Sequence, residues 1–98
     1  MKLTIKYWRD IPSMVSIKQG RKRVKTLLSE RFQEAIDSAA MRGKAVDTDT
    51  YLEDWRDIDK QVDDGDLQQA VDAAALEIEN SFDAERLAII IKNQGHES

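Results

Sequence analysis

The acidic stretch at residues 57–66 is the part of the sequence that most resembles a metal site. Carboxylates at short spacings are the ligands that calcium prefers, and this stretch contains Asp57, Asp59, Asp63, Asp64 and Asp66. An EF-hand loop that began at Asp57 would need glycine at its sixth position and glutamate at its twelfth, where the chain has Val62 and Gln68. We therefore interpret the stretch as a solvated loop that leads into a helix.

The commonest catalytic groups are scarce in this chain. It has no cysteine, and its single histidine is His96, close to the last residue. A zinc site built from Cys and His, or a Ser-His-Asp triad, cannot be assembled from these residues. No glycine-rich phosphate loop occurs, and no pair of carboxylates stands out. We expect a non-enzymatic protein without a cofactor or metal; an enzymatic alternative needs a pocket that brings acids of the loop against Tyr51 or Arg56.

The stretch Gln19–Lys25, QGRKRVK, concentrates four basic residues around Gly20. Such a turn can protect a hairpin from edge-to-edge pairing, dock a partner protein, or contact phosphates of a nucleic acid. Tryptophan and arginine are also favoured at protein interfaces, which brings Trp8 and Arg9 into the same hypothesis. We predict that the chain binds a partner protein through Trp8, Arg9, Arg21, Lys22, Arg23 and Lys25.

Single-stranded nucleic acid is the alternative partner. Tyr7 and Trp8 lie between Lys6 and Arg9, and aromatic residues interleaved with bases can stack on and neutralise such a strand. Neighbouring residues of a strand point to opposite faces, so at most one of the two aromatic rings is free, and the other packs in the core, with Trp55 as a possible neighbour.

Charge is distributed unevenly along the chain. Residues 1–45 contain eleven basic and four acidic residues, whereas residues 46–98 contain four basic and fifteen acidic ones. The formal net charge of −4 therefore describes neither half. The excess of acids in the second half would repel a phosphate backbone unless these acids lie on the far side of the molecule.

The sequence predicts a small α+β fold. Alternation at residues 2–9 indicates a strand, a turn follows at 10–13, and further strands are expected at 14–18 and 24–28. Ser29 is placed as the N-cap of a helix that ends at Gly43 and buries one apolar face: Phe32, Ala35, Ile36, Ala39 and Ala40.

Residues 47–56 suit either a short helix or a strand, and their aromatic content favours a fourth, edge strand. Beyond the acidic loop, a helix follows Asp66 with a stripe at Leu67, Ala70, Val71, Ala74 and Ile78, and a last helix runs from the N-cap Asp83 to Lys92. We expect one domain over residues 1–98, with a basic β-rich part at 1–28, an acidic helical part at 29–94 and a flexible tail at 95–98.

Targeting signals are not recognisable. The first residues alternate charged and apolar side chains, unlike a signal peptide, and no apolar run is long enough to span a membrane. Together with the absence of cysteine, this pattern favours a cytoplasmic location.

Four blocks of the sequence resemble a known family: LTIKYWRDIP at 3–12, RFQEAIDSAAMR at 31–42, TDTYLEDW at 48–55 and FDAERL at 82–87. They are similar to a bacterial family of small proteins labelled "virulence factor" and to the C-terminal region of conserved virulence factor C proteins. The resemblance carries no catalytic residues over to this chain. It implies an accessory role beside folate- or corrinoid-linked methyl transfer, because the chain is too short for the barrel that such enzymes need.

Overall fold

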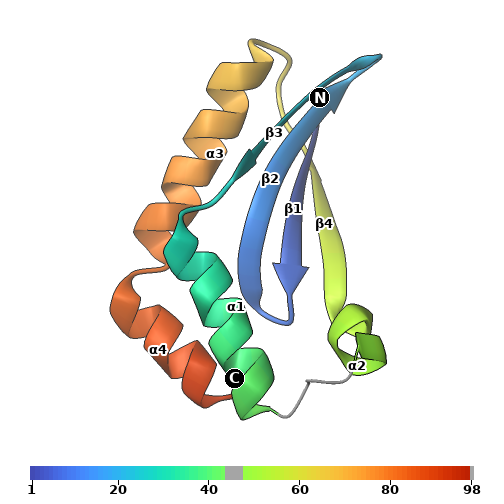
Figure 1. Ribbon diagram of the computed structural model, residues 1–98. Helices are drawn as coiled ribbons and strands as arrows, with labels where there is room; N and C mark the ends of the chain where they lie inside the picture. The colour runs from blue at the N-terminus through green and yellow to red at the C-terminus, as the bar shows by residue number, and fades with distance from the viewer. Residues whose placement is uncertain (44–47, 98) are drawn as a thin grey trace.

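The computed structural model describes residues 1–43 and 48–97, and within these ranges it contains four strands and four helices (Figure 1). In chain order these are β1 (Lys2–Trp8), β2 (Ile11–Gln19), β3 (Lys22–Leu27), α1 (Glu30–Arg42), α2 (Thr48–Glu53), β4 (Trp55–Gln61), α3 (Leu67–Ser81) and α4 (Ala84–Lys92). Strands and helices of this kind, segregated into layers, confirm the predicted α+β class.

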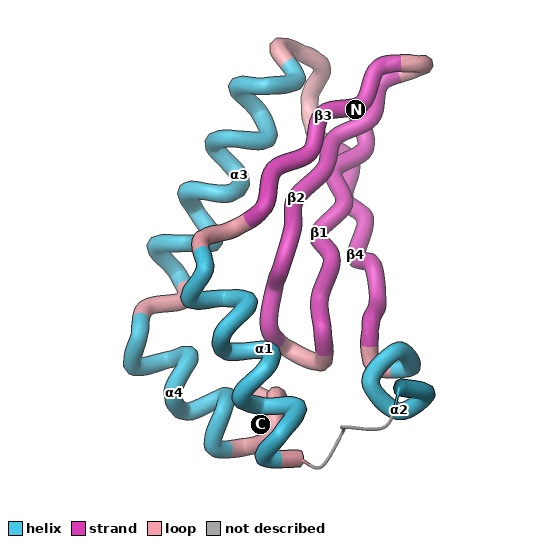
Figure 2. Tube along the Cα trace, viewed as in Figure 1, coloured by secondary structure: helices cyan, strands magenta, loops and turns pink. Residues whose placement is uncertain are grey.

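The strands form one antiparallel sheet in the order β3-β2-β1-β4. Helices α1, α3 and α4 lie on one side of it, as the trace in Figure 2 shows, while α2 lies at the end of β4. The meander β1-β2-β3 confirms the expected three strands. The fourth strand follows the first helix and lies at an edge of the sheet, as expected, and it pairs there with β1.

The position of the fourth strand corrects the sequence interpretation twice. Residues 48–53 form the helix α2 instead of a strand, and residues 57–61, expected in an acidic loop, belong to β4. Pairing with β1 explains this result, because Lys2 lies 3.3 Å from Asp59 and Lys6 lies 3.9 Å from Asp57. Opposite charges on neighbouring strands stabilise a sheet, so these aspartates have partners in a strand that they would lack in a loop.

The first turn is also shorter than predicted. Only Arg9 and Asp10 separate β1 from β2, and Pro12 lies inside β2. The register skips Ser13, since Lys6 pairs with Met14 and Tyr7 with Pro12. A bulge of this kind accommodates proline, which has no N–H to donate to the ladder.

The core lies between the sheet and the three helices. Leu3, Ile5, Val15 and Ile17 point from the sheet toward the helices and are buried. All five residues of the predicted α1 stripe are buried, which confirms that prediction. In α3 only Val71 and Ile78 of the predicted stripe are buried, while the other three are partly exposed.

The predicted helix ends are largely confirmed. Asp66 and Asp83 are N-caps whose carboxylates accept the N–H groups of Gln69 and Arg86. Ser29 occupies the N-cap position of α1 but makes no capping hydrogen bond with its side chain; its hydroxyl donates to Glu79 of α3 instead, at 2.8 Å.

The segment after α4 is not a free tail. The backbone N–H of Asp10 donates to the carbonyl of Gly95 at 2.8 Å, and the N–H of Glu97 donates to the Asp10 carboxylate at 2.7 Å. Gly95 itself is buried. The expectation of a flexible tail is therefore corrected for residues 95–97, and Ser98 lies outside the described residues.

Candidate functional site

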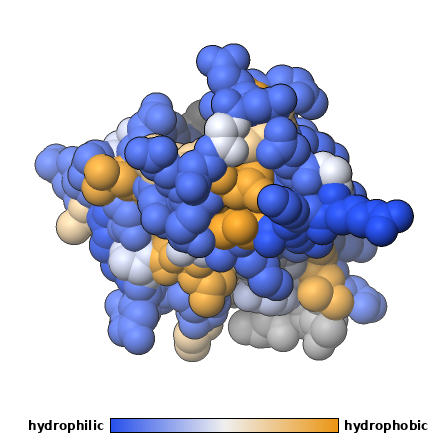
Figure 3. Space-filling view, turned by 90° about the horizontal axis from the view of Figure 1, so that it is seen from above, coloured by the Kyte–Doolittle hydropathy of each residue, from blue (hydrophilic) through white to orange (hydrophobic). Residues whose placement is uncertain are grey.

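The basic turn between β2 and β3 projects away from the helices. It is the tip that points to the upper right in Figure 1, and a strongly hydrophilic arm extends to the same side when the molecule is seen from above in Figure 3. Gly20 has φ +60°, the left-handed conformation that glycine adopts readily. Within the described residues, the exposed side chains of the turn make no ion pair: Arg21, Lys22, Arg23 and Lys25. The acidic half of the chain therefore leaves this turn uncovered.

The strands bring part of the turn onto the uncovered side of the sheet, which we call the open face. Residues paired directly across antiparallel strands share a face, and Arg23 pairs with Lys18 while Lys25 pairs with Ser16. Along β2, Ser16 and Lys18 alternate with the buried Val15 and Ile17 and therefore point to the other face of the sheet. Lys18, Arg23 and Lys25 thus extend over the open face. None of these three cations has an acidic partner within the described ranges.

The β4 side of the open face is neutralised. Besides its ion pair with Lys2, Asp59 accepts a hydrogen bond from the Thr4 hydroxyl at 2.7 Å. That hydrogen bond is the main reason why the pKa of Asp59 is lowered, and Lys2 acts in the same direction. Positive charge on the open face is therefore confined to the β2–β3 side.

An apolar hollow lies on the same face, farther along β2 and β3 from the turn. It has a volume of about 350 Å³ and is lined by Lys6, Ser13, Met14, Leu27, Leu52 and Trp55. Leu27 is 75% exposed and Leu52 is 59% exposed, and exposed apolar side chains that gather around one hollow are typical of interaction sites. Helix α2, which the sequence analysis took for a strand, supplies Leu52 to this hollow.

Trp8 and Arg9 are not part of this surface. Trp8 is fully buried; its ring stacks on Tyr51 at 5.7 Å, and its Nε1 donates to the Tyr51 carbonyl at 2.9 Å. The Arg9 guanidinium lies over the Trp8 ring and pairs with Asp54 at 2.9 Å. Both residues therefore hold α2 against the sheet, and their assignment to a partner-binding site is corrected. The expected neighbour Trp55 packs edge-on against Tyr51.

The arrangement that the enzymatic alternative needs is not formed by the described residues. Alternation along β4 places Asp57 and Asp59 on the open face and Arg56 on the helix side, where it pairs with Asp10 at 2.9 Å. Tyr7, the other residue of the nucleic-acid alternative, also lies on the helix side beneath Arg56, 5.4 Å from its guanidinium. Burial is the main reason why the pKa of the Tyr7 hydroxyl is raised.

Sequence reasoning missed the apolar members of the open face, although a signal was present. In residues 23–27, Arg23, Lys25 and Leu27 share one face of a strand, and the neighbouring Leu28 must then take the other. Leu28 is buried as this alternation requires.

The described residues offer no arrangement of three or more His, Asp or Glu side chains that could hold a metal ion. None of the helices in the described part of the chain combines the length and the apolar composition that crossing a membrane requires.

Comparison with known proteins gives a family but no chemistry. The family model described as "Virulence factor" matches residues 6–91, a range that extends from β1 into α4 and includes both halves of the open face. No curated protein and no solved structure matches the chain. The match covers most of the sequence and confirms the resemblance of its four blocks: the chain belongs to the virulence factor family.

Proposed function

We propose that this protein is a non-enzymatic binding module whose open face docks an acidic, partly apolar segment of a partner protein. One observation carries the proposal: the exposed Leu27 and Leu52 border a shallow hollow on the same face of the sheet as Lys18, Arg23 and Lys25, which have no acidic partner within the described residues. A complementary segment would place apolar side chains in the hollow and carboxylates over the cations.

The two parts of the face contribute differently to binding. Full burial of one leucine side chain stabilises a complex by about 1.5–3 kcal/mol, so the hollow supplies affinity. An exposed ion pair contributes only about 0.2–1 kcal/mol, but a patch of one sign accelerates association and selects against partners of like charge. The open face therefore favours an acidic partner with at least one large apolar residue.

A protein partner is better supported than a nucleic acid. Stacking on bases needs exposed aromatic rings beside the cations. Trp8 is buried, Tyr7 faces the helix side, and Trp55 is partly covered by Tyr51. The hollow on the same face is lined mainly by aliphatic side chains, Met14, Leu27 and Leu52, and the aromatic residue in its lining is Trp55.

The family resemblance supports an accessory role in a bacterial cell, and we place that role in the cytoplasm. The link to folate- or corrinoid-dependent methyl transfer, and to virulence, rests on the resemblance and the family label alone.

The proposal is tested by crosslinking followed by measurement of affinity. A photoreactive amino acid is placed at Leu27, and in a control chain at Leu76, which is 62% exposed on α3. Crosslinked proteins from the native cell are identified by mass spectrometry, and the affinity of the purified partner is then measured by calorimetry. We expect a protein adduct at position 27 that is absent at position 76.

Variants then separate the two parts of the face. Leu27→Ser is expected to weaken the purified complex by about tenfold or more, and the triple change of Lys18, Arg23 and Lys25 to Ser is expected to slow association and reduce its salt dependence. Leu76→Ser should leave the affinity unchanged. Equal affinities of Leu27→Ser, the triple variant and the unmodified chain, or tighter binding of single-stranded DNA than of the protein, would refute the proposal.

A further inference from the structure

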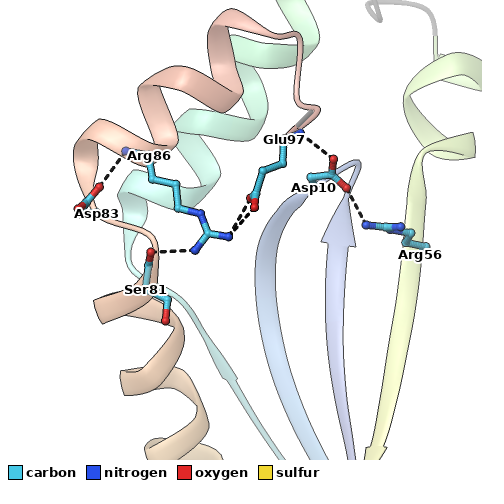
Figure 4. Close-up of polar contacts among 6 residues, drawn as sticks. All are labelled: Asp10, Arg56, Ser81, Asp83, Arg86 and Glu97. Carbon is cyan, nitrogen blue, oxygen red and sulfur yellow. Dashed lines mark hydrogen bonds and ion pairs between the residues drawn. The ribbon is translucent and has the colours of Figure 1, made fainter.

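A second surface lies on the opposite side of the sheet, where β4 extends beyond the helices. Two adjoining hollows, of about 130 and 260 Å³, lie between the strands β1 and β4 and the helices α3 and α4, and both are lined by Tyr7 and Phe82. The floor of the smaller hollow is apolar, with Leu3, Ile5 and Ile78. The larger one adds Ile58 and ends in a group of charged side chains (Figure 4): Asp10, Arg56, Arg86 and Glu97.

Arg86 is held in place by contacts that do not involve Glu97. Its Nη1 donates to the carbonyl of Ser81 at 2.9 Å, and its guanidinium lies 3.8 Å from the centre of the Phe82 ring. Its backbone N–H donates to the N-cap Asp83 at 2.8 Å. The junction of α3 and α4 thus fixes the planar guanidinium and leaves the edge with Nη2 facing the larger hollow.

Glu97 fills that free edge. Nη2 of Arg86 donates to both carboxylate oxygens of Glu97, at 2.7 and 2.9 Å. Glu97 is brought there by its own backbone N–H, which donates to Asp10, and Asp10 in turn accepts from Arg56. Figure 4 shows this chain of contacts from α4 across to β4. The Glu97 side chain is nevertheless 46% exposed, so it can leave without opening the core.

We propose that Arg86 is a carboxylate-binding site that Glu97 occupies within the chain, and that a small free acid with an aromatic or apolar body can replace it. A carboxylate on a fixed arginine is a recurrent and geometrically specific contact. The apolar body would lie against Tyr7 and Ile58, which line the same hollow and are not buried. This site is separate from the open face and does not depend on the function proposed for it.

Competition within the chain sets the expected size of the effect. An exposed ion pair is weak, so removal of the Glu97 carboxylate should raise the affinity for an added acid only modestly, by about two- to fivefold. Glu85 offers a matched control. It is an exposed glutamate of α4, the helix that carries Arg86, and its side chain makes no ion pair or hydrogen bond among the described residues.

The probe is 3-phenylpropionate, with 3-phenylpropan-1-ol as its uncharged analogue, and binding is followed by NMR through the Nε–H signal of Arg86. We expect Glu97→Gln to bind the acid about two- to fivefold more tightly than the unmodified chain and Glu85→Gln to bind it as the unmodified chain does. The alcohol should leave the Arg86 signal in place. Arg86→Lys, which keeps the charge but not the planar fork, should weaken binding of the acid, and thermal melting checks that this variant folds.

Three results with the free acid and its alcohol would overturn the inference. These are equal affinities of Glu97→Gln and Glu85→Gln, equal shifts with acid and alcohol, or unchanged binding by Arg86→Lys. A capped Phe-Glu dipeptide is titrated in parallel; if it binds Glu97→Gln more tightly than the free acid does, the site belongs to a protein side chain and the assignment to a small acid is wrong.

Discussion

The carboxylate of Glu79 is expected to be a major pH-dependent contributor to stability, because it ties the start of α1 to the end of α3. It accepts the backbone N–H and the hydroxyl of Ser29, each at 2.8 Å, and Nη2 of Arg31 at 3.0 Å. Burial acts to raise the pKa of this carboxyl, but the hydrogen bonds from Ser29 and the contact with Arg31 outweigh it, so the pKa is lowered. The ionised form is therefore the one that the folded chain favours.

Glu79→Gln keeps the shape of the side chain and removes its charge. One amide oxygen cannot accept all the hydrogen bonds that two carboxylate oxygens accept, and a hydrogen bond to a charged group contributes about 1.5–3 kcal/mol. Because Ser29 is exposed and the Glu79 side chain is 26% exposed, water compensates part of this loss. We expect the free energy of unfolding to fall by about 1–2 kcal/mol at neutral pH, which corresponds to roughly 5–10 °C in Tm for a chain of this size.

The sign of the pH dependence follows from the lowered pKa. A carboxyl whose pKa is lower in the folded state stabilises the fold above its unfolded pKa, about 4.3, and this contribution is lost as the pH falls through the folded value. The difference between the unmodified chain and Glu79→Gln should therefore be full at pH 7 and shrink below about pH 4. Urea unfolding followed by tryptophan fluorescence at several pH values measures it.

Glu77→Gln is the matched control for this experiment. Glu77 lies on the same helix and is exposed, and its side chain makes no ion pair with the described residues. Its replacement should change the unfolding free energy by less than about 0.5 kcal/mol at any pH. If Glu79→Gln were as stable as Glu77→Gln at pH 7, or if its deficit were the same at pH 3 as at pH 7, the role given to Glu79 would be refuted.

Three further changes test other parts of the fold by thermal or urea unfolding. Trp8→Ala empties a fully buried site and should cost about 3–5 kcal/mol, enough to unfold much of the population at 37 °C; a cooperative transition near that of the unmodified chain would contradict its place in the core. Gly95→Ala should destabilise strongly, since Gly95 has φ +95° and a Cβ there would lie 2.9 Å from the Trp8 ring. Gly65→Ala is the control and should be neutral or slightly stabilising, because a Cβ at Gly65 meets nothing within 4 Å. Equal effects of the two changes on stability would refute this account. Asp66→Ala removes the cap of α3 and should cost about 1 kcal/mol, with no effect expected if the cap is replaced by water.

Local patterns predicted the elements well where one physical signal dominated. The 3.6-residue stripe of α1 and the caps at Asp66 and Asp83 are local features, and each is found as predicted. Residues 48–61 carried two signals at once. Aspartates alternating with Arg56 and Ile58 look like a solvated loop until the lysines of β1 lie opposite them, and that pairing joins residues more than fifty positions apart.

The candidate site was also predicted only in part, because some of its features depend on local sequence and others on contacts between distant residues. The exposure of the basic turn follows from its composition, and it is found exposed. Trp8 was assigned to the surface because an aromatic residue beside arginine is typical of interfaces, but α2 and the segment ending at Glu97 fold over that end of the sheet. Neither contact could be deduced from periodicity, because one joins β1 and the other joins the turn after β1 to distant parts of the chain.

The uneven charge of the sequence acquires a structural meaning through its ion pairs. Of the seven that the described residues form, five join a positive group of residues 1–45 to a carboxylate of residues 46–98. The opposite charges of the two halves thus attract each other across the fold, and the lysines of β1 are neutralised in this way. The cations of the β2–β3 hairpin take no part in it, although the second half has acids to spare. Attraction within the chain therefore does not account for their charge, and protection of the β3 edge would account for charge at the edge but not for the leucines beside it. A surface that combines the two is the one that a partner would recognise.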